Sequence, residues 1–136
     1  MTASCASSEL TRSFEARNLD PAEFRHRDHV QVAFELLQKY DFIDAAAIYA
    51  KGVRSIASRA GASRKFNLTI TYAFMSLIAE SMIARPYEGF PAFVAANPDL
   101  MSKELLIRWY ATDRLQSEAA RGIFLMPEPA LCETEH

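Results

Sequence analysis

Two histidines, His26 and His29, are the side chains of this sequence best suited to carry out chemistry. Their H-x-x-H spacing puts both on one face of an α-helix, where they could share a ligand. A neutral imidazole is a good ligand for transition metals, and it can also act as a general acid or base near neutral pH. We therefore take His26 and His29 as the candidate catalytic residues.

Asn67 and Thr71 form a second polar pair, one helical turn apart in a segment that is otherwise apolar. If three long helices run up, down and up, this pair lies at the same end of the molecule as the histidines. Arg64 and Lys65 occupy the loop just before it, and a helix start next to basic side chains favours an anionic group. The sequence thus predicts a ligand-binding cluster made of Asn67, Thr71, Arg64 and Lys65.

The histidine pair alone does not decide whether the site binds a metal ion or an organic ligand. Zinc sites normally use three or four protein ligands, and no third ligand of the carboxylate type accompanies the two histidines. We predict no cofactor, and we assign a divalent transition metal to His26 and His29 only if one is found on the protein. The structural alternative is that both imidazoles cap or hydrogen-bond backbone groups at a helix start.

The elements that must position these residues are predicted from the spacing of apolar residues, which indicates an all-α fold. We expect a single-domain helical bundle over residues 9–127, between a disordered tail at 1–8 and a loose tail at 128–136. Three long helices are expected over 26–40, 41–60 and 66–84, and shorter ones over 9–18, 90–96, 102–109 and 113–124. Capping signals support these bounds, namely Asp20 with Pro21, Gly61 and Thr112. The helix from 66 is apolar on nearly all sides, which is typical of a buried central helix.

Composition restricts the class of protein further. The 136 residues carry a net charge of -2, which argues against a nucleic-acid partner, and no apolar run is long enough for a membrane span. Cys5 and Cys132 read as free thiols, and the N-terminus lacks the pattern of a secretory signal, so we expect a cytoplasmic protein. The absence of a P-loop, a dinucleotide glycine fingerprint and a nucleophile elbow disfavours NTPases, nicotinamide enzymes and serine hydrolases.

Three other polar or aromatic residues are given structural roles. Glu80 is expected on an exposed stripe of its helix, since a long charged side chain is rarely buried unpaired. Trp109 is expected to anchor the short C-terminal helices on the bundle. Arg121 is expected to form an ion pair that holds the last helix.

Three motifs together resemble an uncharacterised family of short bacterial all-helical proteins. They are F-R-H-R-D-H-V at 24–30, K-F-N-L-T-I-T at 65–71, and L-L-I-R-W-Y at 105–110 with Leu115, Ala120-Arg121 and Pro127. The family patterns are F-x-H-x-x-H-L, K-Y-H-x-T-[IL]-T and L-L-x-R-Y-Y, and the match covers most of residues 24–127.

The resemblance implies a three-histidine site, because the second motif of the family carries a histidine that would meet the H-x-x-H pair. In this chain that position is Asn67, and an amide is a poor ligand for zinc or iron. Either this chain has lost a metal site, or the cluster binds an organic ligand through hydrogen bonds.

Two classes of function follow, and whether the chain is an enzyme stays undecided. The first is a small enzyme or ligand-binding protein, whose polar pocket would orient a small molecule while a histidine acts as acid or base. The alternative is a non-catalytic helical module that pairs with another protein or forms a homodimer. Its contact surface would use the apolar residues Phe42, Tyr87, Phe90 and Phe93. The polar cluster favours the first, since a purely structural bundle has little reason to bury two histidines and an amide together.

Overall fold

The computed structural model describes residues 8–102 and 104–128, and within these residues every regular element is a helix. The predicted all-α class is therefore confirmed. The α-helices are α1 (Glu9–Glu15), α2 (His26–Lys39), α3 (Phe42–Arg59), α4 (Leu68–Ala84), α5 (Phe90–Ala96), α6 (Thr112–Leu115) and α7 (Glu118–Gly122). The 3₁₀ turns are η2 (Pro21–Glu23), η3 (Ser63–Lys65), η4 (Pro98–Met101) and η5 (Leu105–Arg108). Most of both predicted tails, with Cys5 and Cys132, lies outside the described residues.

Local capping explains where the long helices begin and end. The Asp41 carboxylate accepts the N–H of Asp44 at the start of α3, and Gly61 follows its end with a φ of 72°. The segment from Asp20 makes only the single turn η2, because the chain is extended again at Phe24 and Arg25 before α2 begins. Asn67 was expected inside its helix, but it is the N-cap of α4 and accepts the N–H of Ile70.

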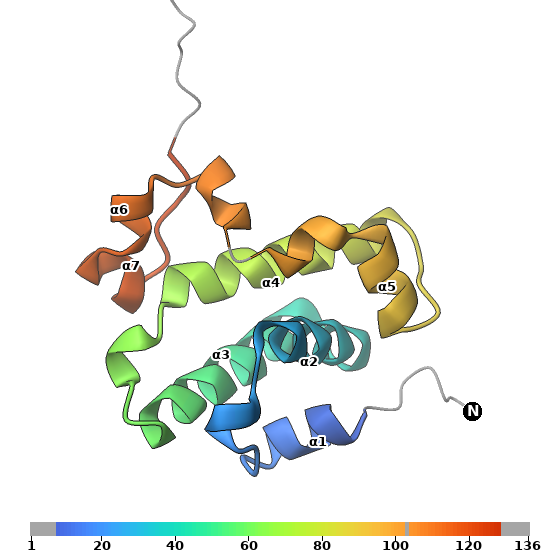
Figure 1. Ribbon diagram of the computed structural model, residues 1–136. Coiled ribbons are helices and arrows are strands. Elements are labelled where there is room, and N and C mark those ends of the chain that lie inside the picture. The colour runs from blue at the N-terminus through green and yellow to red at the C-terminus, as the bar shows by residue number, and fades with distance from the viewer. Residues whose placement is uncertain (1–7, 103, 129–136) are drawn as a thin grey trace, which may run out of the picture.

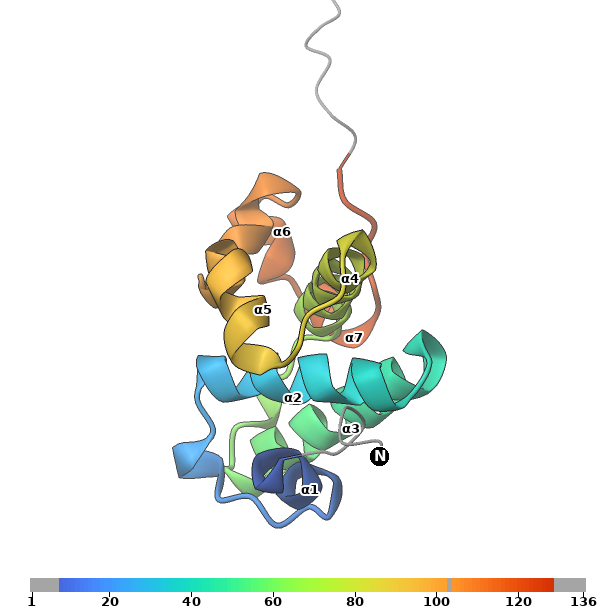
Figure 2. The same ribbon diagram turned by 90° about the vertical axis from the view of Figure 1, so that its right-hand side faces the viewer.

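The long helices do not show the up, down, up course that the sequence predicted. In Figure 1, α2 is seen nearly end-on while α4 lies across the view. In Figure 2, α2 lies across the view and α4 is seen nearly end-on. Helix α2 therefore crosses α4 steeply, and it packs against both α3 and α4 while α1 covers α2 and α3 from the other side. The crossing brings the first turns of α2 over the middle of the other two helices.

Helix α4 contacts α2 and α3 and also α7 and η5, but it is not buried on all sides. Phe74, Met75 and Ile78 face the core, whereas Glu80 is exposed, as predicted, and Ile83 is 83% exposed. Within residues 8–102 and 104–128, no helix combines the length and apolar character that crossing a membrane requires.

The C-terminal region is more broken than the sequence predicted. The helix expected over 113–124 is divided into α6 and α7, because the Ser117 hydroxyl accepts the N–H of Ala120 and starts a new helix. Thr112 is the first residue of α6 and does not cap it. Trp109 is 39% exposed, and the buried Tyr110 takes the anchoring role by donating its hydroxyl to the Leu125 carbonyl at 2.8 Å. Arg121 does form an ion pair, with Glu118 at 2.6 Å.

Helix α1 rests on α3 through the ring of Phe14, which lies against Gly52. Phe14 is 2% exposed, and its ring also packs on Tyr49 and Phe24 with centroids 5.9 and 5.7 Å away. A Cβ at position 52 would overlap the Phe14 ring, which these neighbours hold in place. Glycine at 52 thus allows the close approach of the two helices.

We expect Gly52→Ala to lower the free energy of unfolding by about 1–3 kcal/mol, because the methyl group overpacks the core. The effect opposes the gain of about 1 kcal/mol that alanine normally brings to a helix. Gly122→Ala in α7 is the control, since nothing lies within 4 Å of its Cβ position. Urea unfolding of both variants tests this, and a Gly52→Ala protein as stable as Gly122→Ala would contradict the packing described.

Glu35 on α2 fastens the start of α1. Its carboxylate accepts the backbone N–H and the hydroxyl of Ser8 at 2.9 and 2.8 Å, and the amide of Gln31 at 3.1 Å. Burial alone would raise the pKa of Glu35, but the hydrogen bonds that its carboxylate accepts, that of the Ser8 backbone N–H first, together outweigh burial and lower the pKa from its ordinary value of 4.5. The charged carboxylate therefore stabilises the fold.

Because the folded carboxyl group has the lower pKa, its contribution is present above the ordinary carboxyl range and is lost as the pH falls through the folded value. We expect Glu35→Gln to lose about 1 kcal/mol near pH 7 and to show a weaker decline in stability below that range. Thermal unfolding between pH 7 and pH 3 measures both effects. Glu80→Gln, at an exposed position of α4, is the control.

Candidate functional site

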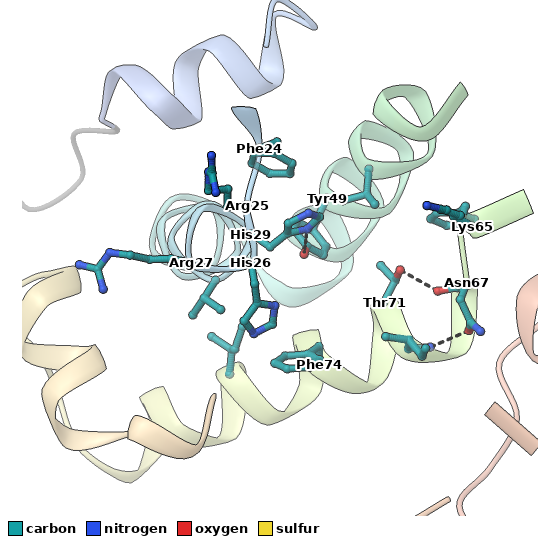
Figure 3. Close-up of a pocket in the computed structure, with 15 residues that line it drawn as sticks. Phe24, Arg25, His26, Arg27, His29, Tyr49, Lys65, Asn67, Thr71 and Phe74 are labelled. Carbon is teal, nitrogen blue, oxygen red and sulfur yellow. Dashed lines mark hydrogen bonds between the residues drawn. The ribbon is translucent and has the colours of Figure 1, made fainter. Parts of the chain in front are cut away.

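A cavity of about 770 Å³ lies where the start of α2 crosses α3 and α4 (Figure 3). We call it the α2–α3–α4 cavity. Its walls combine a polar group of side chains with an apolar floor. The lining residues are Phe24, Arg25, His26, Arg27, His29, Val30, Tyr49, Val53, Lys65, Phe66, Asn67, Ile70, Thr71, Phe74 and Ile78. Both predicted catalytic histidines and three of the four predicted ligand-binding residues therefore line one cavity.

His29 and Tyr49 form the best-ordered polar pair of the cavity. The His29 Nδ1 atom lies 3.1 Å from the Tyr49 hydroxyl, and the His29 ring packs on Phe24 at a centroid distance of 4.1 Å. Tyr49 is 6% exposed, and burial raises the pKa of its phenol far above the ordinary value. The phenol is therefore uncharged, and it can either donate to the imidazole or accept from it.

His26 is turned toward a different neighbour. Its Nε2 atom lies 3.1 Å from the Leu100 carbonyl, and its ring meets Phe74 edge-on at 5.3 Å. Because a carbonyl oxygen only accepts hydrogen bonds, Nε2 carries the proton. Figure 3 shows the two imidazoles leaving α2 in different directions, His29 toward Tyr49 and His26 toward Phe74.

This divergence bears on the predicted metal. The H-x-x-H spacing does put both histidines on the cavity side of α2, but their rings do not converge on one point. Within the described part of the chain, no group of three or more His, Cys, Asp or Glu side chains lies together in a way that could hold a metal ion. The backbone bond of His26 matches the structural alternative for that residue, while His29 bonds a side chain.

Asn67 lines the cavity, but its amide is directed at the protein. Its Oδ1 atom caps α4, and its Nδ2 atom donates to the Leu115 carbonyl at 2.7 Å. The Thr71 hydroxyl donates to the Asn67 carbonyl, also at 2.7 Å. Both residues are 8% exposed, so they build the wall of the cavity, and the Thr71 oxygen keeps an acceptor site that a ligand could use.

The two basic residues predicted to act together are neighbours in the η3 turn, but they line different surfaces. Lys65 lines the cavity, whereas Arg64 lies in a different groove and pairs with Glu118 at 2.8 Å. Arg25 also lines the cavity, while the guanidinium of Arg27 turns away to lie 5.0 Å from the centre of the Phe90 ring. None of the fifteen lining residues, all in the described part of the chain, is Asp or Glu.

The sequence did not reveal Tyr49 as the partner of His29. The sequence predicts an apolar stripe on this helix through Ala47, Ala50, Val53, Ile56, Ala57 and Ala60. Ala50 and Ile56 are buried, but the buried face also includes Ala45 and Tyr49. The alternative stripe at 45, 49, 52 and 56 has the same helical spacing and includes the only residue of that segment with both an aromatic ring and a hydroxyl. A rule that buries the stripe with the larger side chains would have predicted that Tyr49 is buried.

Comparison with protein-family models, with curated proteins and with solved structures finds no match to this chain. The resemblance of its histidine and threonine motifs to a bacterial helical family stays a prediction.

We expect Asn67→His, which installs the residue of that family pattern, to create no zinc site, because the side chain at 67 is directed at Leu115 and the two other imidazoles diverge. The change should also lower the free energy of unfolding by about 2 kcal/mol, through the lost cap and the unpaired Leu115 carbonyl. Asn67→Ser, which keeps a capping hydroxyl, should lose about half as much. Calorimetric titration with Zn²⁺ and urea unfolding test this, and tight Zn²⁺ binding that His29→Ala abolishes would contradict it.

Proposed function

We propose that the chain binds a small organic molecule in the α2–α3–α4 cavity. The observation that carries this proposal is the lining of the cavity, in which His29, Tyr49 and Thr71 face an apolar floor formed by residues such as Ile70 and Phe74. A volume of about 770 Å³ is within the range of cavities that hold small ligands. A buried structural core would normally fill such a space with side chains.

The lining also indicates what kind of molecule fits. An apolar floor favours a ligand with a hydrophobic body, and the imidazole, phenol and hydroxyl groups can hydrogen-bond one polar head. Arg25 and Lys65 line the cavity without any carboxylate beside them in the lining, which favours an anionic head group over a cationic one. We therefore expect a largely apolar molecule that carries a carboxylate or a similar group.

His29 is the residue we assign to the polar head of this molecule. If the chain is an enzyme that converts the bound molecule, the His29 imidazole would act as the general acid or base. The uncharged Tyr49 hydroxyl would fix the orientation of the imidazole ring. His26 is a weaker candidate for the role of acid or base, since one of its ring nitrogens already donates a hydrogen bond to the Leu100 carbonyl.

Self-association is the second candidate function, favoured by apolar side chains exposed near the C-terminal segment. Phe90 and Phe93 do not belong to such a surface, because they are 5% and 0% exposed and lie in the core. Phe42, at the start of α3, is 40% exposed. The exposed apolar residues near the C-terminal segment are Trp109, Phe124 and Met126, at 39%, 41% and 69%. A contact between copies of the chain would cover them.

Native mass spectrometry of the protein, purified without added metal or chelator, is the first test. We expect a bound organic molecule in stoichiometric amount, which extraction and mass analysis would identify. A metal-free and ligand-free monomer would count against the cavity and against self-association alike, whereas a ligand-free dimer would favour the second candidate.

Anilinonaphthalene sulfonate, an apolar anion, serves as a probe when nothing copurifies. We expect saturable binding of one probe per chain, weakened several-fold by Tyr49→Phe and about tenfold by His29→Ala, with helicity unchanged by circular dichroism. Tyr87→Phe is the matched control, because Tyr87 lies outside the cavity and its hydroxyl accepts from Asn97. Equal binding by all three variants would disprove the assignment of the cavity.

A further inference from the structure

A second groove, of about 660 Å³, concentrates positive charge on one side of the molecule. We call it the basic groove. It is formed by the segment after α1, the outer face of α3, the η3 turn and α7, the last three of which lie on the left of Figure 1. Its basic residues are Arg17, Lys51, Arg54, Arg64 and Arg121, and its hydroxyl groups come from Ser55, Ser58 and Ser63.

The charge of the basic groove is opposite to that of the rest of the chain. It holds five of the fifteen lysines and arginines and one carboxylate, that of Glu118. Since the whole chain has a net charge of -2, a groove at +4 leaves -6 on all other residues. Such local concentration is unexpected in an acidic protein, because like charges brought together destabilise the fold unless something compensates for them.

Glu118 compensates for part of this charge. It pairs with Arg121 at 2.6 Å and with Arg64 at 2.8 Å, and these two guanidinium groups, Arg121 first, lower the pKa of the carboxyl group. For Arg17, Lys51 and Arg54, no ion pair is present within the described residues. Three cations of the groove are thus available to an external anion.

The backbone of Arg17 supplies an independent observation. Arg17 has a φ of 63°, the left-handed conformation that follows a helix and that glycine adopts at little cost. A residue with a Cβ is disfavoured there, because its Cβ lies too close to the backbone. Arginine at this position places a guanidinium in the lining of the groove at the expense of local stability.

We propose that the basic groove binds a small molecule through two or more phosphate groups. Guanidinium groups bind phosphate oxygens in pairs, and serine hydroxyls donate to the oxygens that remain. The volume of the groove exceeds that of a single phosphate, and four excess positive charges suit a di- or triphosphate. The negative charge outside the groove opposes an extended polyanion such as a nucleic acid.

Calorimetric titration with inorganic pyrophosphate tests the proposal on the full chain. At about 0.1 M salt we expect pyrophosphate to bind at least tenfold more tightly than sulfate, and binding to weaken as the ionic strength rises. Lys51→Gln and Arg54→Gln should each weaken pyrophosphate binding about tenfold. Arg85→Gln, outside the groove and beside the Tyr87 ring, removes the same charge and should leave the affinity within about twofold.

Arg17→Gly separates binding from stability. It should weaken pyrophosphate binding about tenfold while leaving the melting temperature unchanged or higher, because glycine relieves the positive φ. Arg17→Lys, which keeps the charge and the backbone conformation, should bind pyrophosphate within a few-fold of the unaltered chain.

Four results would overturn the proposal. The first is pyrophosphate binding no tighter than sulfate. The second is an equal pyrophosphate affinity in Arg54→Gln and Arg85→Gln. The third is a loss of pyrophosphate binding in His29→Ala alone, which would place the anion in the α2–α3–α4 cavity. The fourth is a mixed-sequence single-stranded oligonucleotide that binds more tightly than pyrophosphate, which would indicate nucleic-acid binding instead.

Discussion

One buried amide, that of Asn67, sets the position of the elements that surround both candidate sites. Its oxygen caps α4 and its nitrogen holds the Leu115 carbonyl, so the start of a long helix and the C-terminal region are tied to the same side chain. Thr69 adds a second tie, since its hydroxyl donates to the Ile123 carbonyl and accepts the Leu125 N–H. Polar groups buried at this depth must be paired, because an unpaired one costs about 1–3 kcal/mol. These bonds therefore restrict the region to one arrangement.

The η3 turn, which ends two residues before Asn67, contributes to two surfaces of different chemistry. Lys65 lines the α2–α3–α4 cavity and Arg64 lines the basic groove, although they are adjacent in sequence. Phe66 lines both, so the cavity and the basic groove share one aromatic side chain in their walls. Apolar burial would drive binding in the cavity, while charge would drive it in the groove, and the two proposals therefore depend on different physical terms.

The sequence predicted the helices well wherever a local signal existed. Caps such as Asp41 and the apolar periodicity of α2 gave bounds close to those observed, and α5 was predicted at its observed residues. Local patterns could not predict the steep crossing of α2 over α4, because a crossing angle depends on how two surfaces fit. For the same reason the sequence placed Arg64 beside the histidines, and it missed Tyr49, whose role depends on a contact with His29 twenty positions away. The break at Ser117 was missed because a serine can cap a helix or simply lie within one.

The two histidines show how far a spacing motif determines chemistry. H-x-x-H ensures that both side chains leave the same side of α2, and both do line the cavity. What each imidazole does is set by its nearest polar neighbour, the Leu100 carbonyl for His26 and the Tyr49 hydroxyl for His29. A carbonyl fixes the position of a proton, whereas a hydroxyl can both give and accept one. Of these two histidines, only His29 therefore combines a position in the cavity wall with a partner that allows its proton to move. The H-x-x-H spacing could not predict this difference, and the difference makes His29 the centre of the proposed site.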